Sequence, residues 1–295
     1  MMPLKLRWAT TILLLASVQL ASVPDARSQP PVAATSHAPA EHNGGYRLVW
    51  ADEFNVDGPP DPQRWAFEHG FVRNQELQWY QPENAACKDG LLVIEARRQR
   101  VPNTAYAAGS KSWRKSRPHA DYTSACLTTR GLHRWKYGRI EVRARIDARQ
   151  GLWPAIWTLG EAGEWPDSGE VDIMEYYQGD LLANACWSSG VRWSAKWDSA
   201  KKPLSALGGQ PWAARFHTWR MDWDRDRIEL SVDGLTLNTV ALEQTVRVNR
   251  PQSSPFREPH YLLLNLAVGG SNGGDPSETE FPATFEVDYV RVYQR

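Results

Sequence analysis

The chain has 295 residues, which is enough for one large all-β domain or two small ones. Its 34 basic and 34 acidic side chains cancel to a formal net charge of zero, so the composition does not favour nucleic acid or an anionic membrane surface as a partner. The 15 tryptophans fit a protein that stacks indoles on flat apolar faces such as sugar rings, and they equally fit a tryptophan-rich sandwich core.

The N-terminal residues have the pattern of an export signal. Lys5 and Arg7 precede an apolar run from residue 9 to 21, which is short for a membrane span. We expect residues 1–22 to be a signal peptide, and the mature protein to be secreted or periplasmic and away from the membrane. An uncleaved anchor is the alternative. Residues 23–44 are rich in Pro, Ala and Ser and indicate a disordered leader before a folded part over 45–295.

Three cysteines follow, at Cys87, Cys126 and Cys186. In an exported protein an odd count leaves at least one thiol free or paired between chains. A disulfide between Cys126 and Cys186 is compatible with the sequence but is not established by it. The sequence has no C-x-x-C motif and no Cys/His cluster, so it gives no support for a zinc site.

Short strands separated by turn residues, with no long helical periodicity, predict an antiparallel β-sandwich. Polar loop residues 66–81 include Asn74, which can contact a ligand or stabilise its own turn. The irregular basic insertion over 99–120 is either a cleft-lining loop or a surface excursion. Strands are expected over 48–54, 91–98, 122–130, 138–146, 181–188, 216–223, 227–233, 260–268 and 285–293.

The strand Gly138–Ile146 alternates apolar and charged residues, so one face belongs to the core. The charged face, with Glu141 and Arg143, lines a cleft if the strand lies in the inner sheet and faces solvent if it does not. Next along the chain come Trp153 and Trp157, and Pro154 between them argues against a helix.

Residues 169–176 carry three carboxylates, Glu170, Asp172 and Glu175, interleaved with apolar residues. On a regular strand Glu175 would face the opposite side from the other two, and a buried unpaired carboxylate is costly. One extra residue, a β-bulge near Ile173–Met174, would bring all three to one face. Two glutamates on one cleft suit retaining glycoside hydrolysis. A solvated acidic strand is the alternative.

The chain resembles the laminarinase-like branch of glycoside hydrolase family 16, whose signature here is E-x-D-x-x-E. The resemblance extends from about Tyr46 to Gln294 through motifs that occur in a fixed order. These motifs are LVWADEF (48–54), NQELQWY (74–80), DGLLVIEA (89–96), YGRIEVR (137–143), GLWPAIW (151–157), LNLAVGG (264–270) and VDYVRVY (287–293).

The resemblance implies a concanavalin-like jelly roll with an open groove and a family 16 catalytic domain over 45–295. It implies that Glu170 is the nucleophile, that Glu175 is the acid/base and that Asp172 tunes the pair. Substrate-binding positions implied in the same way are Asn74, Glu141, Arg143, Trp153, Trp157 and Asn184.

The resemblance also implies a structural calcium ion away from the cleft. Its ligands would come from Glu53, Gly90 and Asp288, with backbone carbonyls near the first two and the carboxylate of Asp288. Carbonyl and carboxylate oxygens are the ligands that Ca²⁺ accepts. A solvated strand residue explains Asp288 equally well. No cofactor is expected for catalysis.

Two positions depart from the laminarinase pattern. Cys126 stands where many laminarinases have an arginine, and Cys186 stands where they commonly have a histidine before the tryptophan. We therefore expect a monomeric retaining endo-hydrolase of a β-linked polysaccharide, with β-1,3-glucan favoured. A β-galactan-type substrate, transglycosylation, and a non-catalytic lectin on the same fold are the alternatives.

Overall fold

The computed structural model describes residues 45–247 and 253–295. The signal peptide expected over 1–22 and the leader expected over 23–44 lie outside the described residues. No helix among the described residues is long and apolar enough to cross a membrane.

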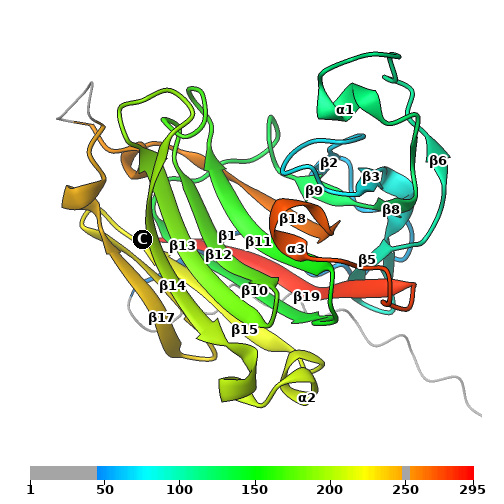
Figure 1. The fold of residues 1–295 in the computed structure, drawn as a ribbon. Coiled ribbons are helices and arrows are strands. Elements are labelled where there is room, and N and C mark those ends of the chain that lie inside the picture. Colours follow the sequence, from blue (N-terminus) through cyan, green and yellow to red (C-terminus); the bar gives the residue numbers. More distant parts are fainter. Residues whose placement is uncertain (1–44, 248–252) are drawn as a thin grey trace, which may run out of the picture. The chain divides into compact units, whose positions relative to one another are not determined.

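Two antiparallel sheets form the fold (Figure 1), which confirms the predicted sandwich. The outer sheet runs in the order β17 (Leu235–Ala241), β16 (Arg227–Val232), β15 (His217–Trp223), β10 (Gly138–Ile146), β19 (Ala283–Gln294), β5 (Leu91–Ala96) and β4 (Ala85–Lys88), and β1 (Arg47–Asp52) also pairs with β19. The inner sheet runs in the order β14 (Ala195–Pro203), β13 (Asp180–Ser188), β12 (Glu170–Tyr177), β11 (Leu152–Gly160), β18 (His260–Val268), β9 (Cys126–Thr128) and β2 (Ala66–Phe67).

Smaller elements lie outside these sheets. They are the parallel pair β3 (Gln78–Tyr80) and β8 (Tyr122–Ser124), the antiparallel pair β6 (Val101–Pro102) and β7 (His119–Ala120), the short helices α1 (Trp113–Ser116), α2 (Gln210–Ala213) and α3 (Gly270–Gly273), and the 3-10 turns η1 (Pro82–Asn84), η2 (Leu204–Leu207), η3 (Leu242–Thr245) and η4 (Pro255–Arg257).

The core lies between the two sheets and follows from the sequence patterns. In β10, Ile140, Val142 and Ala144 are buried on the inward face, as the alternation predicts. In β18 every residue is buried. Its core-facing side chains pack between the sheets, and on the other face Tyr261 and Leu263 pack with Tyr80 and Cys126. Burial of alternate side chains on both sheets is the main stabilising contribution.

The long edge strands β14 and β17 were not predicted, and neither were the short edge strands β2 and β4. β14 is largely polar and carries Lys196, Lys201 and Lys202, whereas β17 is mixed and its alternation ends after Leu237, so neither has the sustained hydrophobic alternation of a core strand. Charged residues are a common protection for sheet edges, which are open to unwanted pairing. These strands extend both sheets beyond the expected boundary.

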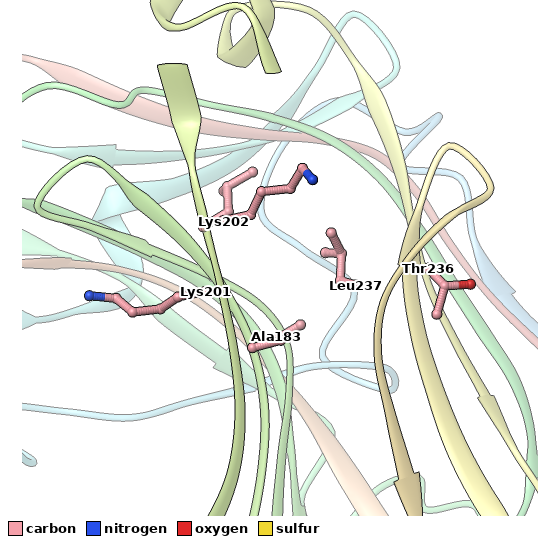
Figure 2. A pocket seen from close by; sticks show the side chains of 7 residues that line it. Ala183, Lys201, Lys202, Thr236 and Leu237 are labelled. Atoms are coloured by element: carbon pink, nitrogen blue, oxygen red, sulfur yellow. The ribbon is translucent and has the colours of Figure 1, made fainter. Parts of the chain in front are cut away.

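A cavity of about 100 Å³ lies between the sheets at these free edges, where β13 and β14 approach β17. Figure 2 shows Lys201 and Lys202 leaving β14 in opposite directions, while Leu237 belongs to β17. The cavity is a different space from the large cleft described below, although Lys201 of β14 lines both.

The three cysteines Cys87, Cys126 and Cys186 are free and buried. The disulfide considered between Cys126 and Cys186 is therefore absent from the structure. Burial raises the pKa of each thiol, so all three are neutral near pH 7.

Candidate active site

A β-bulge in β12 places the three carboxylates on one face of the inner sheet. Asp172 lies opposite Asn184 of β13, whereas Glu175 lies opposite Leu182, so the intervening Ile173 and Met174 share one partner position. Both of these apolar residues are fully buried. The predicted bulge is confirmed, and the extra residue returns Glu175 to the face of the other two acids.

This face forms the floor of a cleft of about 750 Å³. The space is in the size range of ligand-binding sites and is lined by acids, indoles and amides together. Its lining residues are Arg73, Asn74, Glu76, Arg114, Trp153, Ala155, Trp157, Leu159, Trp165, Glu170, Asp172, Glu175, Tyr177, Leu182, Asn184, Trp197, Ser199, Lys201, Asn265 and Asn272.

Glu170 accepts a hydrogen bond from an indole. The Nε1 of Trp165 lies 2.7 Å from its Oε2. Burial raises the pKa of Glu170, and the opposing influences are the Trp165 bond, the positive charge of Arg73 and a hydrogen bond with Asp172. Trp165 lies in the loop before β12, in a segment with no periodic pattern, and sequence reasoning did not identify it.

Glu175 is held by two donors. Trp153 donates from Nε1 to Oε1 at 2.8 Å, and Asn184 donates from Nδ2 to Oε2 at 3.4 Å. Burial, the largest influence, raises the pKa of Glu175 to about 7; the Trp153 bond opposes this, and the charge of Glu170 adds to it. At pH values below about 7 Glu175 therefore holds a proton that it can donate.

Asp172 lies between the two glutamates and is 1% exposed. Burial raises its pKa well above the ordinary value, and the negative charges of Glu175 and Glu170 raise it further. A hydrogen bond between Asp172 and Glu170 lowers the pKa of Glu170 and raises that of Asp172. These directions fit a protonated Asp172 that donates to an ionised Glu170.

A second polar chain crosses the cleft floor beside the acids. Trp157 donates from Nε1 to Oδ1 of Asn265 at 2.7 Å, and Asn265 in turn donates to the Tyr80 hydroxyl at 3.1 Å. This chain fixes the plane of the Trp157 indole. Asn265 was not predicted as a site residue, although it is the one polar side chain between residues 262 and 268, which is the signal that could have identified it.

The loop before β3 contributes Asn74 to the cleft, as expected. Asn74 has a positive φ of 52°, and its Nδ2 lies 3.4 Å from Oε1 of the buried Glu76. Gln78 donates to the other oxygen of Glu76 at 2.7 Å. The contact between Asn74 and Glu76 orients the Asn74 amide at the edge of the cleft.

Glu141 and Arg143 do not lie in the cleft, and this prediction was wrong. Both belong to β10 of the outer sheet, and their side chains are on the face opposite the core. Arg143 forms an ion pair with Asp288 and lies over the ring of Phe216 at 4.7 Å. Alternation identifies the core face of a strand but does not indicate which of the two sheets contains it.

The residues expected around calcium lie near one another along β19. Asp52 of β1 pairs with Val290, and Leu92 of β5 pairs with Val287. The end of β1 and the start of β5 therefore meet the same part of β19, and this junction contains Glu53, Gly90 and Asp288. The donor set expected there, two carbonyls and one carboxylate, fits a hard cation.

Two ion pairs already involve these expected ligands. The carboxylate of Asp288 pairs with Arg143, and that of Glu53 pairs with Arg291 at 2.7 Å. Within the described ranges no group of three or more His, Cys, Asp or Glu side chains could hold a metal ion. A calcium ion at this junction would therefore depend on backbone oxygens together with Asp288.

Comparisons with known proteins agree with this arrangement. The sequence matches the family described as glycosyl hydrolases family 16 over residues 74–291. A beta-glucanase of Rhodothermus marinus is 35% identical over 273 residues, which cover 84% of this chain and 85% of the relative.

Two solved structures with the same fold come from proteins described as different kinds of glycan-degrading enzyme. One comes from work on endo-acting O-glycanases that members of the human gut microbiota express to initiate mucin breakdown; it is 35% identical with a TM-score of 0.79 and covers 87% of this chain and 94% of the other. The laminarinase catalytic domain of Thermotoga maritima MSB8 is 34% identical with a TM-score of 0.70, over 85% of this chain and 98% of the other.

Proposed function

This chain belongs to glycosyl hydrolase family 16 and is a glycosidase, and from that premise we propose that it is a retaining endo-β-glycosidase with Glu170 as nucleophile and Glu175 as acid/base. The observation that carries the proposal is the bulge in β12, which brings both glutamates to one cleft. Burial raises the pKa of Glu175 to about 7, which supports its role as the acid. Retention needs such a pair of carboxyl groups on either side of one glycosidic bond.

In the first step, Glu170 attacks the anomeric carbon. A bond forms between its carboxylate oxygen and that carbon, the glycosidic bond breaks, and the departing oxygen takes the proton of Glu175. Trp165 holds the attacking carboxylate in place, and Trp153 orients the acid. The products of this step are a glycosyl-enzyme and the released sugar chain.

In the second step, Glu175 is a carboxylate and acts as a base. It takes a proton from water, the water oxygen bonds to the anomeric carbon, and the bond to Glu170 breaks. The configuration is inverted twice and therefore retained. Asp172 donates a hydrogen bond to Glu170, which stabilises this carboxylate both before attack and as a leaving group.

A β-1,3-glucan is the substrate we favour, because the beta-glucanase and the laminarinase catalytic domain are 35% and 34% identical to this chain over 84% and 85% of its length. A galactose-containing glycan is the second candidate. The resemblance to laminarinases implies an arginine and a histidine where this chain has Cys126 and Cys186. A keratan-sulfate endo-1,4-beta-galactosidase of Sphingobacterium multivorum is also 28% identical over 254 residues.

A non-catalytic lectin is disfavoured by the same carboxylates. A binding module has no use for a buried acid with a raised pKa beside a second glutamate, and such burial costs stability. We also propose export by the signal peptide over 1–22, a monomeric state, and a structural calcium ion at Glu53, Gly90 and Asp288.

Product analysis tests the function directly. The enzyme is incubated with laminarin, mixed-linkage glucan, agarose, keratan sulfate and gastric mucin, and released reducing ends are measured with oligosaccharide sizes. NMR of the first-formed anomer on the hydrolysed substrate then reports stereochemistry. We expect the β-anomer first; an initial α-anomer would remove Glu170 from the nucleophile role. Release of single sugars from chain ends alone would contradict endo-action.

A further inference from the structure

The insertion over 99–120 carries a concentration of positive charge that the mechanism above does not use. It has five Arg and Lys side chains and no Asp or Glu, although the net charge of the whole chain is zero. The five are Arg100, Lys111, Arg114, Lys115 and Arg117. A cluster of one sign on a neutral protein creates a local field that attracts ligands of the opposite sign.

The insertion is held against the cleft in a fixed position. The side chain of the buried Asn103 donates to the carbonyls of Arg114 and Arg117, each at 2.8 Å. Arg114 donates from Nε to the carbonyl of Val72 at 2.9 Å, and Arg117 donates to the carbonyl of Glu76 at 2.8 Å. Since Arg114 also lines the cleft, the insertion is a cleft-lining segment that braces the loop before β3.

Arg114 differs from the other two cations that line the cleft. Arg73 forms an ion pair with Glu68. Lys201 forms one with Asp180 at 2.8 Å. Arg114 is exposed and has no carboxylate partner among the described residues. Its bonds to the loop carbonyl orient the guanidinium without neutralising it, so its positive charge remains available to an anion in the cleft.

Two lysines extend this charge beyond the cleft. Lys111 lies just before α1 and Lys115 lies within it; both are exposed, and neither forms an ion pair in the part of the chain that the structure describes. Arg100 is instead paired with Asp121 at 3.7 Å. The exposed and unpaired charge of the insertion therefore comes from Lys111, Arg114 and Lys115.

We propose that Lys111, Arg114 and Lys115 bind a negatively charged substituent of the glycan, a sulfate ester or a carboxylate, at the end of the cleft opposite β14. Val72, whose carbonyl orients Arg114, belongs to the loop after β2, and β2 lies at the end of the inner sheet opposite β14 (Figure 1). The inference deepens the proposed function, on which it rests: it adds negative charge to the substrate class, whichever sugar forms the backbone.

The salt dependence of binding distinguishes this role from ordinary contact with sugar hydroxyls. Exposed charges act mainly through the field that they create together, and salt screens that field. The attraction should therefore strengthen binding of an anionic glycan at low ionic strength and fade as salt is added. A neutral form of the same glycan does not respond to the field, so a comparison of the two forms isolates the effect.

The first test measures binding without turnover. Isothermal titration calorimetry on the Glu170→Gln variant compares laminarin oligosaccharides with their sulfated and carboxymethylated forms, and keratan sulfate oligosaccharides with their desulfated forms. We expect the charged forms to bind about tenfold more tightly than the neutral ones at low ionic strength, and this preference to be largely lost at about 0.5 M NaCl. The sulfated and carboxymethylated laminarins show which kind of anion is preferred.

Variants locate the effect on the insertion. In the same background, Lys111→Gln combined with Lys115→Gln should reduce the preference for charged forms by about threefold or more, and Arg114→Gln should reduce it further. Arg114→Lys retains the charge and should keep part of the preference. Arg225→Gln is the matched control, because it removes an exposed cation between β15 and β16 of the outer sheet. If Arg114→Gln does not fold, as judged by circular dichroism, the lysine variant decides.

The second test is kinetic and uses the wild-type background with whichever glycan it hydrolyses. The ratio of kcat/KM on the charged form to that on the neutral form should fall in the insertion variants and stay unchanged in Arg225→Gln.

Equal affinity for charged and neutral forms, or a preference that persists in the folded insertion variants, would overturn the proposal. Equal affinity together with binding of the protein to phosphatidylglycerol vesicles would assign the charge to a membrane surface instead. A wild type that hydrolyses none of the glycans would contradict the proposed function, and the calorimetric comparison would still decide the anion preference.

Discussion

At the residue scale, the two glutamates differ through their neighbours rather than through their own chemistry. Each accepts one indole N–H, from Trp165 in one case and Trp153 in the other. Only Glu170 is also influenced by the charge of Arg73. The same side chain can therefore act as an ionised nucleophile at one position and as a protonated acid five residues later.

Replacing either glutamate should nearly abolish turnover. Glu170→Gln cannot form the glycosyl-enzyme, and Glu175→Gln cannot protonate the leaving oxygen, so we expect kcat to fall by about 10²–10⁴-fold or more with the fold intact. Steady-state rates and circular dichroism measure both effects. Added azide should partly rescue Glu170→Ala and give an inverted product. A near wild-type rate in either glutamine variant would refute its assigned role.

The pH dependence of kcat/KM follows from the directions of the two pKa shifts. Glu170 must be ionised, so activity is lost as pH falls through its raised pKa; Glu175 must be protonated, so activity is lost as pH rises through about 7. We expect a bell-shaped profile with its optimum on the acidic-to-neutral side. The two limbs belong to the coupled pair. A rate that still rises above about pH 9 would be inconsistent with Glu175 as the acid.

The same shift predicts a change in stability. The pKa of Glu175 is raised to about 7 in the folded state, compared with 4.5 in the unfolded state. The contribution of this group to the free energy of unfolding is therefore fully present below pH 4.5 and is lost as pH rises through about 7. Glutamine does not ionise, so the Glu175→Gln variant does not lose stability as pH rises. It should therefore melt at a higher temperature than the wild type at pH 8 but not at pH 4. The exposed Glu243, changed to Gln, is the control. Equal melting temperatures of wild type and Glu175→Gln at pH 8 would contradict the shift.

At the scale of elements, the alternation of side chains correctly predicted which face of a single strand each residue occupies. The bulge at Ile173–Met174 follows from the cost of turning Glu175 into the core, and the structure has it there. The position of Trp165 could not be derived in this way, because a loop has no period to read. Assignment of a strand to one sheet also needs long-range pairing, which explains the wrong prediction for Glu141 and Arg143.

The location of β10 in the outer sheet yields a paired prediction. Arg143→Met should leave kcat/KM of the folded enzyme within about twofold of wild type, since its partner Asp288 lies outside the cleft. Trp153→Phe should lower kcat/KM by about tenfold or more, because it removes the N–H that orients Glu175. Rate measurements on both variants decide. A large loss of kcat/KM in Arg143→Met would indicate that β10 does contact the substrate.

At the scale of the whole described fold, the inner sheet bears the cleft and the outer sheet supports it. The cleft extends from the braced loop with Asn74 to the edge strand β14, where Trp197 is 48% exposed. An indole half open to solvent at one edge of a cleft of about 750 Å³ fits a chain of sugars better than a single one. The sequence motifs identified the fold and the acids, but the edge that sets the length of the cleft was missed because β14 is polar.

The outer sheet is also where the calcium prediction belongs. The end of β1, the start of β5 and the β19 residue Asp288 meet there, and an extra residue in β19 interrupts its pairing with β10 at this point. A cation bound to carbonyls at such a junction would join three strands that are far apart in sequence. It would stabilise the folded state by mass action and have no part in the reaction.

Chelation should therefore lower the melting temperature by about 5 °C or more, which corresponds to about 2.7 kcal/mol of binding free energy when calcium is present at 100 times its dissociation constant. Asp288→Ala should melt low with or without chelator, because it lacks the carboxylate ligand. Arg143→Met is the matched control: it removes the ion-pair partner of Asp288 but leaves the carboxylate for calcium, so its melting temperature should still respond to chelator. Activity of the folded enzyme should stay nearly constant in all three. If chelator leaves the wild-type melting temperature unchanged and elemental analysis finds no calcium, there is no metal site at this junction. Asp288 then has only its ion pair with Arg143 there.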